Sequence, residues 1–499
     1  MVQPFMAGAL TRSACGFAGA LSAFALLATA TACEPRPPAP RAACLPVPPT
    51  HEAVAASTPA PAPDSPPLPA EPAEPRDSRH VVLVSIDGLR PDYYTHADAY
   101  HLAIPNLRSL MARGRYAEAM IGTWPTVTYP AHTTLVTGAR PSRHGILANR
   151  VFDPTYCNQG GWRWYAEDIK ADTLWAAARR AGKTSGSVYW PVTVGAAIDD
   201  NFPQMWRAKC DADDPLLRSL MTPGLADAYE REYGALPAEH RTDHQRGNAA
   251  EFLVRERRHD LTLVYFTDLD DAQHAYGPGS RQALATLEKI DAELGRVVRA
   301  VDAAGDTKRT AVIVVSDHGF APVSSVVKPA VLLRAAGLID VSPAGTVTRW
   351  QAGVLAGGGL AGIYLKDPDD PVLRERVGRL LDDAAADARS GIRAVHRPEV
   401  SEREGGFPGA SFVLEAQPGY EFDVGLTGPA VGHSSDKGAH GYPPRTPDMA
   451  ASLVAAGSGI RQGPPLHEVS MLAIAPTVAK LLGITLHDAE APALSELVE

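Results

Sequence analysis

Acidic residues follow three strongly apolar segments of the chain. Asp87 follows HVVLVSI, Asp270 comes shortly after LTLVYF, and Asp317 follows AVIVVS. In an open parallel sheet, ligands bind beyond the carboxyl ends of the strands, so we expect these carboxylates to converge. Converging carboxylates repel one another unless cations lie among them. One such Asp alone is more often a helix cap or a turn residue, but three together with neighbouring histidines predict a metal site.

Histidines accompany two of these carboxylates, and another stands in a glycine-flanked loop. His274 follows Asp270 by four residues, so their side chains share one face if the stretch is helical. His318 directly follows Asp317, and His440 lies in the loop KGAHGY. A mixture of Asp and His suits Zn²⁺ better than Mg²⁺, which prefers oxygen ligands. Two metal ions about 4 Å apart would clamp the attacking and leaving oxygens of a phosphoryl transfer.

A nucleophile is expected in the hydroxyl-rich stretch TWPTVTYPAHTTLVTG, which covers residues 123–138. The run from residue 133 to 136 predicts the start of a helix, whose free N–H groups would face a phosphoryl oxygen. A metal-bound threonine just ahead of that helix would be nucleophilic. Composition alone does not choose among four threonines, and a Thr/Pro turn that caps a helix is the alternative. The candidates are Thr123, Thr126, Thr128 and Thr133.

The elements that must position these residues alternate between strands and helices. The segments 80–86, 261–266 and 311–316 are nearly continuous apolar runs, which is typical of central strands buried on both faces. Between the last two, apolar residues recur at helical spacing. This pattern predicts a βαβ unit and an α/β fold with a mostly parallel sheet. We expect one large domain, in which residues 150–255 supply a lid or a pocket wall.

Composition narrows the function further. The chain has 499 residues and a formal net charge of −10, which does not suggest a nucleic-acid-binding surface. An anionic substrate would therefore have to be attracted by local cations such as metal ions. The five cysteines include no CxxC pair, so the metal ligands must come from His, Asp and Glu.

The N-terminal region has the sequence features of a targeting segment followed by a spacer. Residues 1–33 resemble a signal peptide, and the final ATAC resembles a lipoprotein cleavage site with Cys33 as the lipidated residue; simple secretion is the alternative. Residues 34–79 are rich in Pro and Ala and predict an extended linker. The catalytic domain is expected at 80–499. The protein would be exported to the periplasm or cell envelope, with a lipid anchor as its membrane contact. An exported chain can form a Cys157–Cys210 disulfide, and two free thiols are the alternative.

Together these residues carry a family resemblance. The segments VSIDGLRPDY, PTVTYPAHTTLVTGARPSRHGILAN, YFTDLDDAQHAYGP, SDHGF, KGAHGY and MLAIAPTVAKLLGI occur in order between about residue 80 and residue 485. The chain resembles the nucleotide pyrophosphatase/phosphodiesterase family of the alkaline-phosphatase superfamily. This resemblance implies an alkaline-phosphatase-like fold with inserted lid segments. The chain departs from the family's usual residues at Ala131, Leu269 and Gln273.

The resemblance also implies roles for individual residues. Thr128 would be the nucleophile and a metal ligand, and Asn149 would contact a phosphoryl oxygen. One zinc would be held by Asp270, His274 and His440, and the other by Asp87, Asp317, His318 and Thr128. The reaction implied is hydrolysis of a phosphodiester or pyrophosphate bond through a covalent phospho-threonine, in which two zinc ions and the Thr128 N–H stabilise the charged oxygens.

Several substrates remain compatible with this sequence. Monoester-selective relatives carry a Lys-x-Arg pair, which is lacking in SVYWPVTVGAAIDDNFPQMW, so a diester is favoured. Tyr129 and Trp206 would stack on a nucleotide base, and core packing is the alternative for each ring. A lipid-head-group or sugar phosphodiester also fits. The rival functions are a phosphomonoesterase or phosphonate hydrolase with the same fold, a magnesium-dependent phosphomutase-like enzyme, and a non-catalytic tethered binding protein.

Overall fold

The computed structural model describes residues 79–156, 161–205, 214–236 and 242–499. Its centre is an eight-stranded sheet, in which β17 runs antiparallel to both of its neighbours and the other pairs are parallel. In spatial order its strands are β18 (Leu466–Ser470), β2 (Gly114–Ile121), β17 (Leu453–Gly457), β6 (Thr310–Val315), β1 (His80–Ile86), β5 (Leu261–Phe266), β3 (Ser185–Val188) and β4 (Asp200–Phe202). The prediction of an α/β fold with a mostly parallel sheet is confirmed.

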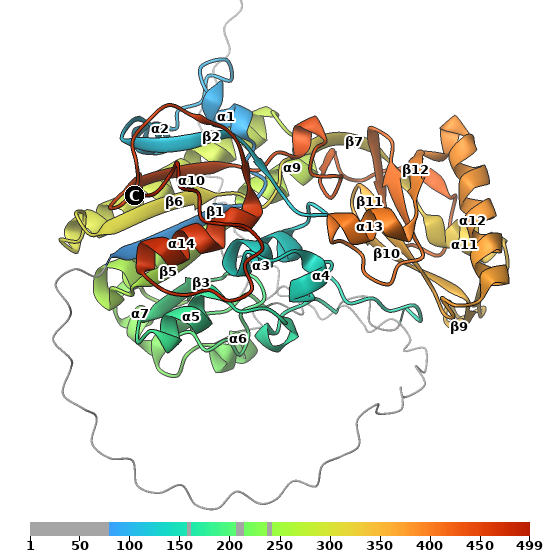
Figure 1. Cartoon of the computed structure of the whole chain (residues 1–499), viewed down its shortest axis with the longest axis horizontal. Helices are drawn as coiled ribbons and strands as arrows, with labels where there is room; N and C mark the ends of the chain where they lie inside the picture. Colours follow the sequence, from blue (N-terminus) through green and yellow to red (C-terminus); the bar gives the residue numbers. More distant parts are fainter. Residues whose placement is uncertain (1–78, 157–160, 206–213, 237–241) are drawn as a thin grey trace, which may run out of the picture. The chain divides into compact units, whose positions relative to one another are not determined.

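Helices cover both faces of this sheet (Figure 1). One face packs against α2 (Pro105–Ala112), α6 (Asp214–Leu220), α7 (Leu225–Tyr233), α8 (Asp243–Phe252), α9 (Asp268–Tyr276) and α10 (Arg281–Ala303). The other packs against α3 (Thr128–Thr137), α5 (Leu174–Arg180) and α14 (Ile474–Leu482). Every residue of β1, β5 and β6 is therefore buried, which explains why their sequences are continuously apolar. Within the described ranges, none of the helices combines the length and apolarity of a membrane span.

The βαβ unit predicted from the sequence consists of β5, α10 and β6. Both strands pair in parallel with β1, which lies between them in the order β6-β1-β5. The carboxyl ends of all three strands consequently meet at one edge of the sheet. This topology is the reason why side chains 180 to 230 residues apart in the chain reach the same place.

A second, antiparallel sheet is formed by residues between β6 and β17, and it was not predicted from the sequence. It has the order β10 (Ala352–Gly357), β11 (Leu360–Leu365), β13 (Phe412–Ala416) and β12 (Ile392–His396). Its tight β10–β11 turn reaches the functional site, because Gly359 N–H donates to the His440 carbonyl at 2.9 Å. Gly358 in this turn has φ +70°, and a Cβ there would lie 2.0 Å from the same carbonyl oxygen, so only glycine fits.

The remaining elements connect these two sheets. Among the described residues, five more short strands pair around β7 (Ala321–Val327) or with each other. A third sheet joins β7 to β14 (Gly419–Phe422), β15 (Val431–His433) and β16 (Gly438–Ala439), and a hairpin is made by β8 (Ile339–Val341) and β9 (Val347–Trp350). The other α-helices are α1 (Pro91–Thr95), α4 (Pro141–His144), α11 (Pro329–Ala335), α12 (Pro371–Ala386) and α13 (Pro398–Glu404).

Candidate metal centre and nucleophile

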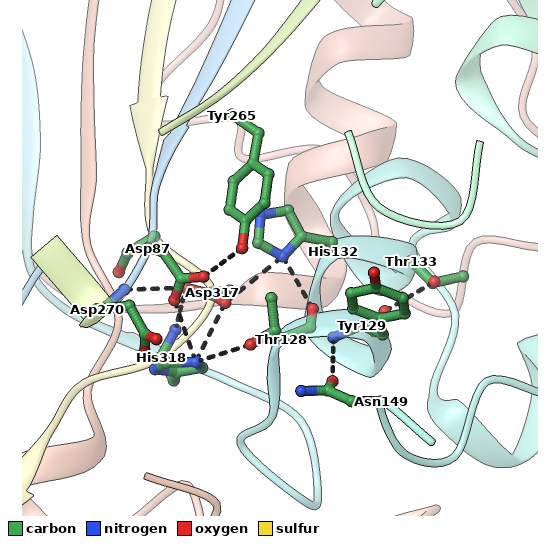
Figure 2. A network of polar contacts seen from close by, with 12 residues as sticks. Asp87, Thr128, Tyr129, His132, Thr133, Asn149, Tyr265, Asp270, Asp317 and His318 are labelled. Carbon is green, nitrogen blue, oxygen red and sulfur yellow. Dashed lines mark hydrogen bonds and ion pairs between the residues drawn. The ribbon is translucent and has the colours of Figure 1, made fainter. Parts of the chain in front are cut away.

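The first group of possible metal ligands lies at the ends of β1 and β6. His318 Nε2 is 3.3 Å from Asp87 Oδ1 and 3.2 Å from Asp317 Oδ2. One ligand atom from each of the three residues lies within 4.8 Å of the other two, and all three side chains are buried. Figure 2 shows these side chains facing one another, with the Thr128 hydroxyl beside them. We call these three residues the strand-end group.

The second group is built from a helix and a loop. Asp270 and His274 lie one turn apart on α9, as the spacing predicted, and His274 Nε2 is 3.5 Å from Asp270 Oδ2. His440 Nε2 approaches Asp270 Oδ1 at 3.7 Å. These three residues, which we call the helix-loop group, also satisfy the 4.8 Å criterion and are partly exposed. The structure thus brings the six residues together in the two sets that the family resemblance implies.

The histidines of both groups have the same orientation. In each, Nδ1 lies 2.9–3.1 Å from a backbone carbonyl, which can only accept a hydrogen bond. The acceptors are Gly319 O for His318, Gly438 O for His274 and Thr126 O for His440. Nδ1 therefore carries a proton in each ring, and Nε2 faces the carboxylates. This orientation is that of metal-binding imidazoles, whose second nitrogen is fixed by an outer hydrogen bond.

Each of the three carboxylates keeps one buried oxygen without a hydrogen-bond partner among the described residues. These atoms are Asp87 Oδ1, Asp270 Oδ1 and Asp317 Oδ2. Leaving a buried carboxylate oxygen unpaired is costly, and native proteins compensate for it with a partner or a metal. The unpaired oxygens therefore fit the binding of cations at this edge of the sheet.

The shifted pKa values of these side chains in the protein without metal also favour the binding of cations at this edge of the sheet. Burial raises the pKa of Asp87 well above its usual range, and the charges of Asp270 and Asp317 raise it further. Burial and the charge of Asp270 raise the pKa of Asp317 to about 8, and burial raises the pKa of Asp270 to about 6. Burial lowers the pKa of His318 well below its ordinary value, so its ring is neutral. A bound cation would reverse the carboxylate shifts, because it favours the ionised forms.

Thr128 is the threonine that the fold places at this centre. Its Oγ1 lies 3.4 Å from His318 Nε2 (Figure 2). The hydroxyls of the other three candidates donate to backbone carbonyls instead: Thr123 to Pro125, Thr126 to Tyr442 and Thr133 to Tyr129. The predicted helix start was wrong, because α3 begins at Thr128 rather than near residue 133. The nucleophile candidate is thus the first helical residue, not one that precedes the helix.

Asn149 lies beside the first turn of α3. Its Oδ1 accepts a hydrogen bond from Tyr129 N–H at 2.8 Å. This contact fixes the side-chain amide, so that its Nδ2 donors are directed away from the helix backbone. Figure 2 shows the amide nitrogen on the side of Thr128, where a phosphoryl group attacked by that hydroxyl would need a donor for its oxygens.

Comparison with known proteins shows which family the chain matches. The profile of type I phosphodiesterases / nucleotide pyrophosphatases matches residues 81–443, which include all six ligand candidates, Thr128 and Asn149. The chain belongs to this family. Among curated proteins it is 28% identical over 254 residues to an uncharacterized pyrophosphatase/phosphodiesterase of Schizosaccharomyces pombe. It is 29% identical over 252 residues to human ectonucleotide pyrophosphatase/phosphodiesterase family member 5. Each alignment covers 49% of this chain and 45% of the relative, so it spans less than half of the relative's length.

Solved structures of the family share the fold. Human ectonucleotide pyrophosphatase/phosphodiesterase 5 superposes with a TM-score of 0.60 at 22% identity, covering 82% of this chain and 96% of that one. The murine protein, solved as an inactive threonine-to-alanine variant in complex with AMP, gives a TM-score of 0.59 at 21% identity over 82% of this chain and 96% of its own. At these identities the match establishes the alkaline-phosphatase-like fold.

The position of the Tyr129 ring favours core packing, which was the alternative to stacking on a nucleotide base. Its ring is 1% exposed and its hydroxyl donates to Gln204 Oε1 at 2.9 Å. Trp162 and Trp164 cover it, with ring centroids 5.3 and 6.1 Å away. A base could stack on Tyr129 only by displacing one of these rings, because no face of the phenol is open. Trp206, Cys33 and the Cys157–Cys210 pair fall outside the described residues.

Three further residues support the candidate metal centre, and no feature of the sequence indicated that they would. Tyr265 donates its hydroxyl to Asp87, and His132 Nδ1 lies 2.8 Å from the Thr128 carbonyl oxygen. Gln273, noted only as a departure from the family's usual residue, donates to Gly88 O at 2.9 Å and accepts from Tyr93 at 2.7 Å. All three side chains are polar and buried. A buried polar side chain is also compatible with ordinary hydrogen bonding in the core.

Proposed function

We propose that this chain is a two-zinc phosphodiesterase or nucleotide pyrophosphatase that uses Thr128 as its nucleophile. One observation carries the proposal: the Thr128 hydroxyl lies 3.4 Å from His318 Nε2, next to buried carboxylate oxygens that lack hydrogen-bond partners among the described residues. A threonine so placed has the surroundings that activate a hydroxyl. Membership of the type I phosphodiesterase / nucleotide pyrophosphatase family supports the reaction class.

The two ligand groups would each hold one zinc ion, since both are mixed sets of nitrogen and oxygen donors. Bound zinc would lower the pKa of a hydroxyl or water and neutralise charge on the phosphoryl oxygens. The strand-end group would also use Thr128 Oγ1, which gives it four donors. The helix-loop group offers three, which leaves a position for water or substrate.

The chain's own residues then account for the steps. Thr128 would lose its hydroxyl proton to solvent and attack phosphorus: an Oγ–P bond forms, the bond from phosphorus to the leaving alcohol or phosphate breaks, and the leaving oxygen takes up a proton from solvent. Water would next attack the phospho-threonine, cleave the Oγ–P bond, return a proton to Oγ1 and release the second product. The Asn149 amide and the Thr128 N–H, at the first residue of α3, would donate to the equatorial oxygens that gain charge.

A nucleotide is the substrate class that we favour. A murine family member has been solved with AMP bound, and the curated relatives are named as nucleotide enzymes. Trp162, which covers the residue next to the nucleophile, is partly exposed and would offer aromatic surface to a base, whereas Trp164, stacked on it at 5.7 Å, is buried. Rates on bis-nitrophenyl phosphate, nitrophenyl phosphate, dinucleotides and nucleoside triphosphates test this proposal. A monoester hydrolysed orders of magnitude faster would show a phosphomonoesterase instead.

We also propose that the protein is exported from the cytoplasm. The Pro/Ala-rich segment and the signal-like N-terminus precede the matched region, which begins at residue 81. Fractionation of cells that express the full chain should place the protein outside the cytoplasm. Cys33→Ala should release it from membranes if Cys33 is lipidated, and a soluble wild-type protein would favour simple secretion.

A further inference from the structure

Tyr265 contacts Asp87, a member of the strand-end group. It lies on β5 opposite Ser85 of β1, and the two strands are parallel. Asp87 follows Ser85 by two residues and so lies on the same side of the sheet, one step further along. A tyrosine hydroxyl can span that step, and Tyr265 donates a hydrogen bond to Asp87 Oδ2 (Figure 2).

This hydrogen bond gives the two carboxylate oxygens of Asp87 different environments. Oδ2 is occupied by Tyr265, whereas Oδ1 has no hydrogen-bond partner among the described residues and faces His318 Nε2 at 3.3 Å. Asp317 shows the same division, but there the backbone makes it: Oδ1 accepts from Gly88 N–H at 3.2 Å and from His318 N–H at 3.1 Å. Asp87 thus depends on a side chain for an orientation that Asp317 obtains from the main chain.

The Tyr265 ring is itself held in place. It is 2% exposed, and its centroid is 4.4 Å from the His132 ring. The Arg246 guanidinium lies 5.4 Å from the ring centroid and donates to the Tyr265 carbonyl oxygen at 3.0 Å. Burial between these groups leaves the hydroxyl no route to solvent, so its direction toward Asp87 is set by packing.

We propose that Tyr265 is a positioning residue of the metal centre: its hydroxyl fixes Asp87 so that Oδ1 points at the position shared by His318 Nε2 and Thr128 Oγ1. The inference rests on the proposed metal-dependent function. It assigns Tyr265 an effect on metal retention and on the nucleophile, with no contact to the rest of the substrate. Outer hydrogen bonds to metal ligands have this role elsewhere, and their loss costs about 10–100-fold in metal affinity or activity.

Tyr265→Phe tests the proposal, because it removes one oxygen and keeps the ring between its neighbours. The affinity of one of the two bound zinc ions, measured by competition with a chelator, should fall about 10–100-fold. The kcat for bis-nitrophenyl phosphate should fall by a similar factor while KM stays within about twofold, because only the chemical step uses Asp87. Excess zinc should restore part of the lost rate.

Tyr94→Phe is the matched control. Tyr94 is 3% exposed, and its hydroxyl donates to Ala117 O at 2.6 Å within the core. It should lose a similar amount of thermal stability but keep both zinc ions and full activity. A double-mutant cycle adds a second test: with Asp87→Ala already in place, Tyr265→Phe should cause no further loss of zinc affinity.

The outcomes separate this inference from the proposed function. If wild-type protein binds two zinc ions and hydrolyses diesters while Tyr265→Phe retains both ions with unchanged affinity and kcat, the inference is wrong and the function stands. An additive cycle with Asp87→Ala would also overturn it. If the wild-type protein binds no zinc or hydrolyses no phosphate ester, the proposed function itself fails.

Discussion

The two ligand groups differ in how the chain builds them. The strand-end group consists of residues one to three positions beyond the ends of β1 and β6, and the side chains of Asp317 and His318 are 0% exposed. In the helix-loop group the side chains of Asp270, His274 and His440 are 16%, 29% and 11% exposed. Their positions depend on α9 and on a loop held by the inserted sheet. A site formed by packed parallel strands is preorganised, whereas one formed between a helix and a loop can open, so the strand-end group should bind metal more tightly.

The largest expected effect concerns Thr128, the proposed nucleophile beside the strand-end group. Thr128→Ala should lower kcat by at least about 10³-fold, because the covalent route is lost. Both metal ions should remain, since three protein ligands of the group are unchanged. Assays on bis-nitrophenyl phosphate and metal analysis of the same preparation measure the two effects.

Thr133→Ala is the control for this variant, since it removes a hydroxyl of the same helix that donates to Tyr129 O. It should remain within a few-fold of wild type, about the effect of one lost hydrogen bond. Turnover by Thr128→Ala at the wild-type rate would exclude Thr128 as the nucleophile.

Removing one carboxylate from each group compares the two directly. Asp317→Asn should release the ion of the strand-end group and lower activity by about 10²-fold or more. Asp270→Asn should release only the ion of the helix-loop group and leave the other ion bound. Zinc content by elemental analysis, together with chelator titration of each variant, measures this difference.

With wild-type protein, a chelator should remove zinc in two phases, first from the partly exposed helix-loop group, and added zinc should restore activity. If both ions leave in one phase, or if the buried ion leaves first, the proposed difference between the groups is wrong.

The β10–β11 turn offers a smaller and more local test. Gly358→Ala would place a Cβ 2.0 Å from the His440 carbonyl oxygen and should shift that loop. Zinc affinity of the helix-loop group should fall about 10-fold, with the strand-end group unaffected. Gly345→Ala is the matched control, because Gly345 also has a positive φ (+84°) but a Cβ there meets no atom within 4 Å. It should cost about 1 kcal/mol of stability and no zinc. Equal zinc losses in both variants would contradict a role for the turn.

The smallest expected effect is the pH dependence of the metal-free protein. The pKa of Asp317 is raised to about 8 and that of His274 to about 9, the latter by the charge of Asp270 against an opposing effect of burial. Both folded-state pKa values exceed the unfolded ones, so each group contributes stability at low pH that is lost as pH rises through these values. His318 and His440, whose pKa values are lowered, add no slope above about pH 6.5.

The melting temperature of metal-free protein should therefore fall between pH 7 and pH 9, and the increase caused by added zinc should grow over the same interval. Scanning calorimetry with and without zinc measures both. A melting temperature that rises with pH in the absence of metal would contradict the raised pKa values.

The sequence predicted the parts of this site that depend on local periodicity. Continuous apolar runs identified β1, β5 and β6, and the four-residue spacing identified the shared face of Asp270 and His274. The start of α3 was missed because Pro130 and the neighbouring threonines suggest a turn, although Pro is well tolerated in the first turn of a helix. The inserted sheet was missed because its glycine-rich strands lack a clear alternation.

What the sequence determined by itself is the set of candidate ligands, the central strands and the class of chemistry, because these follow from residue type, short-range spacing and family motifs. Only the tertiary structure decided which of the four threonines meets His318, that the Tyr129 ring is covered, and that the Tyr265 hydroxyl reaches Asp87. These three results depend on contacts between segments far apart in the chain. The order β6-β1-β5 and the packing of α3 against the sheet create those contacts, and no local pattern encodes them.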